Sequence, residues 1–419
     1  MNITITPKKL SGEVSVVSSK SLSHRYLIAA GLSKGTSVIE NILDSDDLDA
    51  TKEALKSLGV IIDGNQITGG NLKTVKDTID AKESGSTLRF MIPIAMLLRD
   101  KITFTGQGRL PKRPLDVYFD IFKQKHCYYN QLTTDYLPLE VKGQLKPGFY
   151  QVQGDISSQF LTGLLFALPL LKKDSVIELI TPLESKGYID LTMDVLKSFG
   201  IQIVHIDEFI YIKGSQSYLP QSVTVEGDYS QAAFWMVAGL IGNHIELFNL
   251  ALDSKQGDKK IIDIIKEMNG NITYKSLSKS YVVEPSLTKG ATIDLMHVPD
   301  LGPILMVLAA LSEGTTKFIN TSRLRIKESD RLQAMYEVLI KFDVDMEILG
   351  DEAIIHGKKI LKGHQSFDSY GDHRITMAIA IAAIKADGPV TILNAGVVNK
   401  SYPEFFKVYQ SLGGAIHES

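Results

Sequence analysis

The stretch LKSLGV at Leu55–Val60 ends a helix with an apolar face at a Gly, and related stretches recur five more times along the chain. The other copies are the more degenerate IFKQKHC at Ile121–Cys127, then LKSFGI at Leu196–Ile201, IKEMNG at Ile265–Gly270, LIKFDV at Leu339–Val344 and YQSLGG at Tyr409–Gly414. Successive copies lie 66 to 75 residues apart. Self-similarity at a fixed period predicts a repeat architecture in which each repeat buries a face against its neighbours.

An almost wholly apolar helix leads each copy, and a β-rich run follows that helix. We expect the six helices to open at Ser21, Ser84, Ser157, Asp228, Asp300 and Asp372. Ser and Asp are good N-caps, and a helix that is apolar on all sides is buried. Runs such as Thr36–Leu43 and Lys101–Gly106 are rich in strand-forming residues. The pattern predicts a mixed α/β fold.

The number of copies also predicts two domains, with three copies before residue 227 and three after it. The stretch Val223–Ser230 is the expected crossing point, and the β-like opening of the chain is expected to pair with the second domain. We therefore predict a C-terminal lobe of residues 1–18 plus 228–419 and an N-terminal lobe of residues 19–227. Two strands would form the hinge, and a cleft between the lobes would open and close.

Composition narrows the class of protein. The 419 residues are 44% hydrophobic and 22% charged, as in globular proteins, with a net charge of −3. This near-neutral charge does not favour nucleic acid as a partner. The longest apolar run, Phe160–Leu171, is too short to span a bilayer. With one cysteine, Cys127, and no apolar signal core in MNITITPKKL, we expect a cytoplasmic protein without a membrane partner.

The helix openings are suited to holding anions, because free N–H groups and the helix dipole meet there. Several openings add side-chain donors, at Lys20–Arg25, Ser84–Arg89 and Ser157–Gln159. The loop Arg109–Pro114 adds cations and is stiffened by two prolines. For each segment alone, ordinary capping or solvated charge is an equally simple explanation.

The segment Arg323–Leu332 gives a sharper signal. If it is helical from Lys327 onward, Lys327 and Arg331 lie one turn apart on one face, where like charges repel. Two aligned cations beside Glu328 are typical of an anion clamp with an acid or base group; the alternative is a surface ion network. Asp300 could cap the fifth helix or act as a general base in the cleft.

Eleven segments, in order along the chain, resemble those of the 5-enolpyruvylshikimate-3-phosphate (EPSP) synthase family. They are KSLSHR (Lys20–Arg25), NILDSDD (Asn41–Asp47), ESGSTLRF (Glu83–Phe90), KRP (Lys112–Pro114), SSQFLTGLLFALP (Ser157–Pro169), SKGYIDLT (Ser185–Thr192), VEGDYSQA (Val225–Ala232), HVPD (His297–Asp300), LRIKESDRL (Leu324–Leu332), GDHRITMA (Gly371–Ala378) and KSYPEFF (Lys400–Phe406).

This resemblance implies a fold of two lobes, each of three βαβαββ units, sometimes called an inside-out α/β barrel. It implies that the 5-hydroxyl of shikimate 3-phosphate attacks C2 of phosphoenolpyruvate, and that a tetrahedral ketal then loses phosphate. No metal or organic cofactor is expected, and we expect a monomer.

The resemblance also assigns roles to residues. Asp300 would take the proton of the attacking hydroxyl, and Glu328, with Lys20 nearby, would protonate the methylene carbon. The residues expected to bind shikimate 3-phosphate are Lys20, Ser21, Arg25, Ser157, Ser158, Gln159, Ser185, Tyr188, Asp300, Arg323 and Lys327. Those expected to bind phosphoenolpyruvate are Lys20, Gly85, Arg113, Gln159, Arg331, Arg374 and Lys400.

The chain departs from the family pattern at a few positions. Glu83 stands where many members have an amide, Arg323 where Asn is frequent, and Gly187 and Phe90 where Pro is frequent. Three alternatives remain. A UDP-N-acetylglucosamine enolpyruvyl transferase would carry a reactive Cys in Gly106–Pro114, an RNA 3′-phosphate cyclase would need a nucleotidylated His, and a non-catalytic anion-binding protein would lack the acid and base residues.

Overall fold

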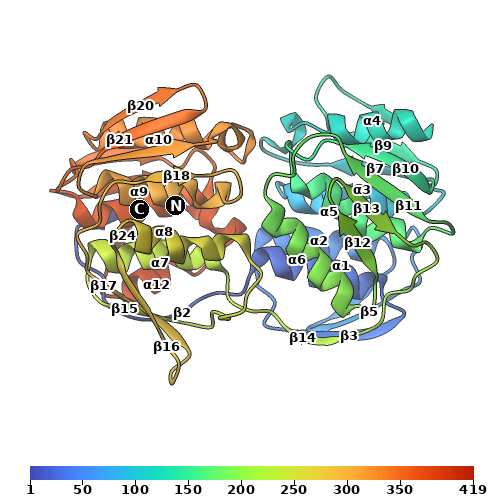
Figure 1. Cartoon of the computed structure of the whole chain (residues 1–419), viewed down its shortest axis with the longest axis horizontal. Coiled ribbons are helices and arrows are strands. Elements are labelled where there is room, and N and C mark those ends of the chain that lie inside the picture. The colour runs from blue at the N-terminus through green and yellow to red at the C-terminus, as the bar shows by residue number, and fades with distance from the viewer. The chain divides into compact units, whose positions relative to one another are not determined.

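The computed structural model of this protein describes all 419 residues, and the chain forms two compact units (Figure 1). The N-terminal unit is Ser19–Val225, and the C-terminal unit combines Met1–Ser18 with Glu226–Ser419. Ser18 and Gly227 pair in an antiparallel bridge, so the two segments at which the chain passes from one unit to the other lie side by side.

Each unit contains three four-stranded sheets built on one plan. A parallel pair comes first, and two antiparallel pairings follow. In the N-terminal unit the strand orders are β14 (Ser222–Thr224), β3 (Gly35–Glu40), β5 (Gln66–Gly69), β4 (Ile61–Asp63); β6 (Thr78–Asp80), β7 (Lys101–Thr105), β9 (Leu139–Lys142), β8 (Tyr128–Gln131); and β10 (Gly148–Val152), β11 (Ser175–Leu179), β13 (Phe209–Ile212), β12 (Ile203–Ile206).

The C-terminal unit repeats this plan. Its strand orders are β16 (Asn271–Lys275), β17 (Ser280–Glu284), β15 (Ile245–Phe248), β2 (Gly12–Ser15); β18 (Thr292–Asp294), β19 (Thr315–Ile319), β21 (Glu352–His356), β20 (Asp345–Leu349); and β22 (Gln365–Asp368), β23 (Val390–Leu393), β1 (Ile3–Thr6), β24 (Ala415–Glu418). The predicted βαβαββ repeat is confirmed in both units.

Each repeat has two helices, one after its first strand and one after its second. Those of the N-terminal unit are α1 (Lys20–Leu32), α2 (Asp46–Ser57), α3 (Gly85–Ala95), α4 (Asp116–Lys125), α5 (Ser158–Ala167) and α6 (Lys186–Ser198), with 3₁₀ turns η1 (Leu110–Lys112) and η2 (Leu168–Leu170). Those of the C-terminal unit are α7 (Tyr229–Ile241), α8 (Ile261–Glu267), α9 (Gly302–Ala310), α10 (Arg331–Lys341), α11 (His373–Ala382) and α12 (Phe405–Ser411), with η3 (Gly257–Lys260), η4 (Pro299–Leu301), η5 (Ser322–Ile326), η6 (Ala383–Lys385) and η7 (Ala395–Lys400).

The ends of the repeats are exchanged between the units. β2 precedes α1 in the sequence, yet it pairs in parallel with β15 of the C-terminal unit. β14 precedes α7, yet it pairs in parallel with β3 of the N-terminal unit. β1 lies between β23 and β24 and so completes the sixth repeat. The first strands of the chain therefore belong to the C-terminal unit.

The leading helices form the cores, as their apolar sequences predict. In the C-terminal unit α7, α9 and α11 pack on one another, and every residue of these three helices is buried. In the N-terminal unit α3 packs closely on α5. Gly163 permits this approach, because a Cβ there would lie 2.4 Å from the carbonyl oxygen of Arg89. The core thus fixes the position of an arginine at the opening of α3.

Four of the six expected caps are confirmed. Ser84, Ser157, Asp228 and Asp372 each accept a backbone N–H in the first turn of their helices. The first expectation was wrong by two residues, because Ser19 caps α1 and Ser21 already lies in its first turn. The fifth was also wrong: Asp300 lies in η4, and α9 begins at Gly302 without a side-chain cap. Ion pairs to cations occupy the Asp300 carboxylate instead.

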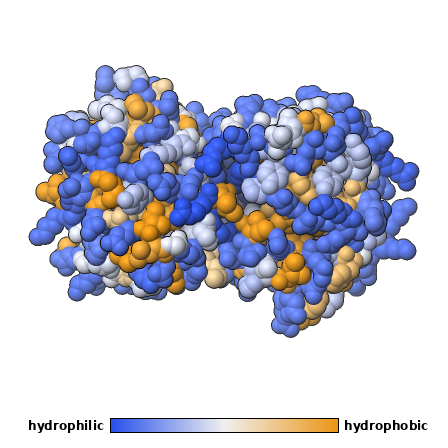
Figure 2. Space-filling view, turned by 90° about the horizontal axis from the view of Figure 1, so that it is seen from above, coloured by the Kyte–Doolittle hydropathy of each residue, from blue (hydrophilic) through white to orange (hydrophobic).

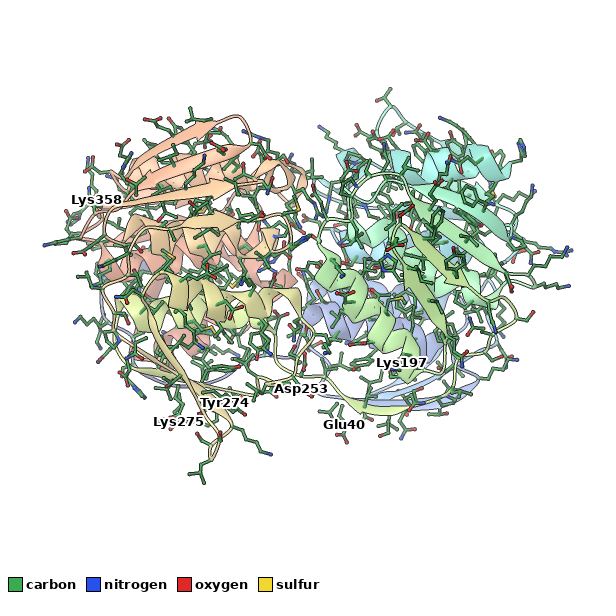
Figure 3. All side chains as sticks on the ribbon, in the orientation of Figure 1. Glu40, Lys197, Asp253, Tyr274, Lys275 and Lys358 are labelled. Carbon is green, nitrogen blue, oxygen red and sulfur yellow. The ribbon has the colours of Figure 1, made fainter.

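The surface is mainly hydrophilic on the face shown in Figure 2, with hydrophobic residues in separate groups. The β16–β17 hairpin extends away from the helices of its unit (Figure 1), and Figure 3 shows Tyr274 and Lys275 on it. None of the helices has both the length and the apolar character needed to cross a membrane.

Candidate active site

The predicted site residues fall into two groups, one in each unit. We call the first group the N-terminal half-site; it consists of Lys20, Ser21, Arg25, Gly85, Arg113, Ser157, Ser158, Gln159, Ser185 and Tyr188. These residues lie at the openings of α1, α3, α5 and α6 and in the loop before α4. We call the second group the C-terminal half-site; it consists of Asp300, Arg323, Lys327, Glu328, Arg331, Arg374 and Lys400.

Arg25 links the opening of α1 to α6. Its Nε donates to Oγ1 of Thr192 at 2.8 Å, Nη1 donates to the Ser21 carbonyl at 2.8 Å, and Nη2 donates to the Tyr188 carbonyl at 3.0 Å. The guanidinium also lies 5.4 Å from the centre of the Phe90 ring. Burial lowers the pKa of Arg25 to about 10. Arg25 therefore brings the predicted residues Ser21 and Tyr188 together by hydrogen bonds to their carbonyl groups.

Gln159 joins the openings of α3 and α5. Its Oε1 accepts from Nη1 of Arg89 at 2.7 Å, and its Nε2 donates to Oγ of Ser86 at 3.0 Å. Arg89 also lies 4.7 Å from the centre of the Phe160 ring. The site prediction did not include Arg89, although its place one turn inside an anion-binding helix opening was a usable signal.

Gly85 and Arg113 are in close contact. A Cβ at Gly85 would lie 2.7 Å from Nη1 of Arg113 and 3.0 Å from its Cζ, inside normal contact distance. Only Gly therefore lets this guanidinium lie on the first residue of α3, where free N–H groups and the helix dipole favour an anion. The structure thus brings together two residues predicted to hold phosphoenolpyruvate.

Lys20 is placed by a carboxylate that the site prediction missed. Its Nζ lies 2.9 Å from Oδ2 of Asp47, and both side chains are largely buried. Asp47 belongs to the NILDSDD segment, so the family resemblance contained a signal for it. The pairing holds the Lys20 ammonium at the first residue of α1.

The hydroxyls of the N-terminal half-site lie at two other openings. Ser157 caps α5 by accepting the Gln159 N–H at 3.3 Å, and Ser158 is the first residue of that helix. Ser185 precedes α6 with a φ of 52°, a left-handed conformation that is uncommon for a residue other than Gly. Tyr188 is the third residue of α6 and lies in its first turn.

The C-terminal half-site is centred on Asp300. Its Oδ1 lies 3.0 Å from Nζ of Lys327 and 2.9 Å from Nη1 of Arg331, and its Oδ2 lies 3.2 Å from Nη2 of Arg374. Burial raises the pKa of Asp300, but the charges of these three cations outweigh that effect and hold the pKa well below its ordinary value. Asp300 is therefore an anion in this structure.

Arg331 holds three carboxylates at once. Besides Asp300, its Nη2 donates to Oε2 of Glu328 at 2.7 Å and its Nε donates to Oδ2 of Asp372 at 2.8 Å. Its side chain is 1% exposed. Burial opposes the charge, but the three carboxylates raise the pKa of Arg331 above its ordinary value. One buried guanidinium thus connects the residues predicted to act as base and acid.

The helix that was considered from Lys327 onward is not formed. Lys327 follows η5 in an extended conformation, with a φ of −86° and a ψ of −159°, and α10 begins at Arg331. Asp330 caps that helix by accepting the Gln333 N–H at 3.0 Å, which is the physical reason for the later start. Lys327 and Arg331 still converge, because both bind Asp300 rather than because they share a helix face.

The remaining cations lie around this centre. Nη1 of Arg374 donates to the Asp300 carbonyl at 3.3 Å, and Nζ of Lys400 donates to the Gly371 carbonyl at 2.9 Å. Arg323 is buried in η5, and its charge, like that of Arg331, helps lower the pKa of Lys327. The largest cause is burial, and the pKa of Lys327 falls to about 8.

Two carboxylates of this centre lie outside the predicted set. Asp372 caps α11 and binds Arg331, so its role extends beyond the predicted cap. Asp258 is buried in η3 and accepts a hydrogen bond from Ser230 of α7. Burial, with the charge of Asp300 as the next cause, raises the pKa of Asp258 to about 6. No sequence signal that we used points to Asp258.

No group of three or more His, Cys, Asp or Glu side chains is arranged to hold a metal ion. What the two half-sites offer is cations, hydroxyls and helix openings. Such groups bind phosphate and carboxylate anions, and the carboxylates of Asp300 and Glu328 can exchange protons with a bound substrate.

Comparisons with known proteins agree with this chemistry. The family model described as EPSP synthase (3-phosphoshikimate 1-carboxyvinyltransferase) matches residues 5–409. A 3-phosphoshikimate 1-carboxyvinyltransferase of Clostridium novyi is 49% identical, over 100% of this chain and 98% of that protein. One from Clostridium kluyveri is also 49% identical, over 99% of this chain and 98% of the relative.

Solved structures show the same fold. The EPSP synthase of Acinetobacter baumannii has a TM-score of 0.83 at 24% identity, with all of both chains covered. The enolpyruvyl transferase NikO of Streptomyces tendae has a TM-score of 0.81 at 15% identity, covering 100% of this chain and 98% of that one. The solved structures establish the fold, and the sequence matches establish the family. The chain belongs to the EPSP synthase family of 3-phosphoshikimate 1-carboxyvinyltransferases.

Proposed function

We propose that this chain transfers the enolpyruvyl group of phosphoenolpyruvate to the 5-hydroxyl of shikimate 3-phosphate and releases phosphate, a step in aromatic amino acid biosynthesis. Membership of the EPSP synthase family supports the reaction class. The observation that carries the proposal is the contact of one buried guanidinium, that of Arg331, with both Asp300 and Glu328.

Both substrates are polyanions, and the proposal assigns each of them partners in both half-sites. Shikimate 3-phosphate would bind Lys20, Arg25 and Lys327, together with the hydroxyls of the N-terminal half-site. Phosphoenolpyruvate would bind Arg113 on Gly85, and also Arg331, Arg374 and Lys400. The contact of Arg113 with the opening of α3 supports this second assignment, because cation and helix dipole favour an anion at the same point.

In the addition step, the 5-hydroxyl oxygen forms a bond to C2 of phosphoenolpyruvate while Asp300 takes the hydroxyl proton. The electron pair of the C2–C3 double bond takes a proton from Glu328, and the proposal assigns the Lys20 ammonium to the same step. The product of this step is a tetrahedral ketal. A positioned acid and a positioned base each contribute on the order of 10²–10⁴-fold to the rate.

In the elimination step, the Glu328 carboxylate, which gave up its proton in the addition step, takes a proton from C3, and the electron pair of that C–H bond forms the C2–C3 double bond again. The bond from C2 to the phosphate oxygen breaks, and phosphate leaves with that electron pair. Cations aimed at the leaving oxygen stabilise the charge that develops there, which is usually the larger contribution to catalysis. Arg331 and Arg374 are suited to this role, because both are buried and hydrogen-bonded in fixed positions.

The low pKa of Asp300 makes its carboxylate a weak base in the chain without substrates. In this structure Lys327, Arg331 and Arg374 all face its carboxylate. In our proposal the phosphate and carboxylate groups of the substrates take over these cations. Asp300 would then lose part of its electrostatic stabilisation as an anion, and its pKa would rise toward the range in which it accepts a proton.

The proposal includes a monomeric enzyme that acts in the cytoplasm and needs no cofactor. Its test is phosphate release by the purified chain with both substrates present. We expect phosphate only when shikimate 3-phosphate and phosphoenolpyruvate are added together, and none when UDP-N-acetylglucosamine replaces shikimate 3-phosphate. Absence of phosphate above background at saturating substrates would overturn the proposal, and equal release with the UDP-sugar would reassign the acceptor.

A further inference from the structure

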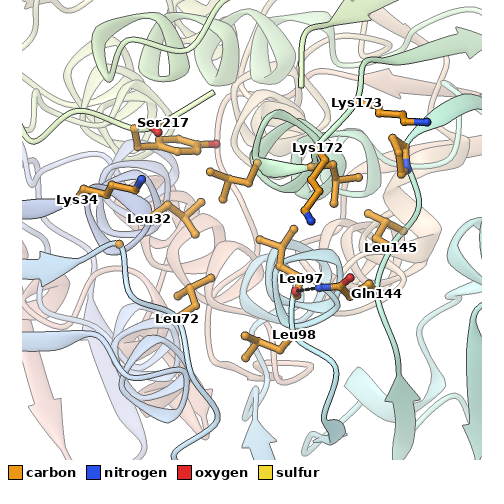
Figure 4. A pocket seen from close by; sticks show the side chains of 15 residues that line it. Leu32, Lys34, Leu72, Leu97, Leu98, Gln144, Leu145, Lys172, Lys173 and Ser217 are labelled. Atoms are coloured by element: carbon orange, nitrogen blue, oxygen red, sulfur yellow. Dashed lines mark hydrogen bonds between the residues drawn. The ribbon is translucent and has the colours of Figure 1, made fainter. Parts of the chain in front are cut away.

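A cavity of about 570 Å³ lies in the N-terminal unit, away from every residue assigned to the reaction (Figure 4). It is formed where the leading helices end. Leu32 closes α1, Leu97 and Leu98 follow α3, and Leu170 and Leu171 follow α5. Because α1 rises about 1.5 Å per residue, Lys20 and Leu32 lie about 18 Å apart along it. The cavity is thus at the opposite ends of the helices that open into the N-terminal half-site.

The lining is apolar in the middle and positive at the edge. The leucines are joined by buried Leu145 and by the ring of Tyr218, whose hydroxyl is satisfied by the Phe166 carbonyl at 2.7 Å. Three lysines complete the lining, Lys34, Lys172 and Lys173, and no Asp or Glu lines the cavity. Figure 4 shows Lys34 and Lys172 directed toward the leucines and Lys173 directed away from them.

These lysines have no carboxylate partner within the chain. None of the three side chains forms an ion pair or a hydrogen bond. The nearest acid in sequence, Asp174, lies outside the lining and accepts the Gly214 N–H at 2.9 Å. Apolar walls with a few polar groups, at a volume of several hundred Å³, are typical of small-molecule sites. Charge complementarity favours an anion.

We propose that this cavity binds an amphipathic carboxylate, with its apolar body against the leucines and its carboxylate at Lys34 and Lys172. The site is separate from the proposed function and does not depend on it. Another role for the lysines is to offset the partial negative charge at the helix C-termini. That role needs no ligand, so binding measurements distinguish it from the proposed binding of a carboxylate.

Isothermal titration calorimetry of the full chain with octanoate tests the proposal, with octanamide as the neutral comparison. We expect saturable binding of one octanoate per chain and weaker binding of octanamide. In a series from hexanoate to decanoate, each added methylene should tighten binding up to about fourfold while it still enters the cavity. Absence of saturable octanoate binding, or equal affinity for octanamide, would overturn the proposal.

Variants locate the site. Lys34→Ala and Lys172→Ala should each weaken octanoate binding about two- to fivefold, as expected for exposed ion pairs. Lys197→Ala is the matched control, because Lys197 is an exposed lysine on α6 that does not line the cavity (Figure 3). Leu98→Asp should abolish binding, with circular dichroism as the check on folding. Unchanged affinity in both lysine variants would overturn the assignment.

A second readout does not depend on any variant being folded. With ¹³C-methyl labelling of leucines, octanoate should shift the methyl resonances of Leu32, Leu98 and Leu171 in the unmodified chain. Shifts confined to leucines outside the cavity, such as exposed Leu277 on the β16–β17 hairpin, would place the ligand elsewhere and overturn the proposal.

Discussion

Nη1 of Arg331 lies 2.9 Å from Oδ1 of Asp300, and this contact joins the proposed general base to a guanidinium that is 1% exposed. The same guanidinium binds Glu328, the proposed acid, at 2.7 Å. Both carboxylates are therefore positioned by one rigid group, while Asp372 anchors that group to the opening of α11. A base and an acid held in this way cannot move independently.

Asp300→Asn should lower kcat on the order of 10²–10⁴-fold, because an amide cannot take the proton of the attacking hydroxyl. The Asn keeps the shape of the side chain, so KM for both substrates should change much less than kcat. Steady-state kinetics with both substrates measure the two effects. Asp345→Asn, at an exposed position on β20, is the matched control. A kcat near that of the unmodified chain would rule out Asp300 as the base.

The pKa of Lys327 predicts the alkaline side of the pH profile. Burial lowers the pKa to about 8, so the ammonium that we assign to shikimate 3-phosphate loses its proton as pH rises through that value. We expect kcat/KM for shikimate 3-phosphate to fall above about pH 8. Lys327→Arg should remove this decline, because Arg stays protonated. A decline that persists unchanged in Lys327→Arg would contradict the assignment.

Asp258 should make stability depend on pH in the opposite direction to an ordinary ion-paired carboxylate. Its pKa is raised to about 6 in the folded chain, against about 3.9 in an unfolded chain. Between these values the folded state binds more protons, so the contribution to stability is fully present below about pH 4 and is lost as pH rises to about 6.

Asp258→Asn should remove that loss, because the amide does not ionise and can still accept from Ser230. Thermal unfolding of both proteins from pH 4 to 7 gives the comparison. The difference in Tm should move in favour of Asp258→Asn as pH rises. A difference that is constant across this range would show that Asp258 keeps an ordinary pKa.

Much of the fold was predictable because the same pattern, an apolar helix followed by a β-rich run and a second helix, recurs six times along the chain. Four apolar helices could be predicted to be buried and capped from their own residues alone; they open at Ser84, Ser157, Asp228 and Asp372. The sequence predicted crossing points near residues 18 and 227 but not the partners of β2 and β14, because strand partners far apart in sequence leave no local pattern.

Each wrong or missed prediction has its own physical cause. A second serine before Ser21 made two caps equally plausible, and Ser19 is the one used. Asp300 resembles a cap in sequence, but three cations distant in the chain compete for its carboxylate. Spacing alone suggested that Lys327 is helical, whereas Asp330 caps α10 and the helix begins at Arg331. Asp258 could not be found, since its importance arises from burial beside Ser230.

Gly85→Ala should weaken phosphoenolpyruvate binding without unfolding the chain. The new Cβ would lie 2.7 Å from Nη1 of Arg113, so the flexible guanidinium must move away from the opening of α3. Loss of a hydrogen bond to a charged group costs about 1.5–3 kcal/mol, or about 10- to 150-fold in affinity. KM for phosphoenolpyruvate should rise accordingly, while KM for shikimate 3-phosphate, the internal control, stays near its value. Equal changes in both constants would contradict this account.

The most direct test of the proposed reaction is the product itself. Incubation of the chain with shikimate 3-phosphate and ¹³C-labelled phosphoenolpyruvate, followed by NMR, should show vinyl resonances of an enolpyruvyl ether at O5 and an equal amount of phosphate. Asp300→Asn should form this product far more slowly. Phosphate without the O5 ether, or no reaction at saturating substrates, would contradict enolpyruvyl transfer by this chain.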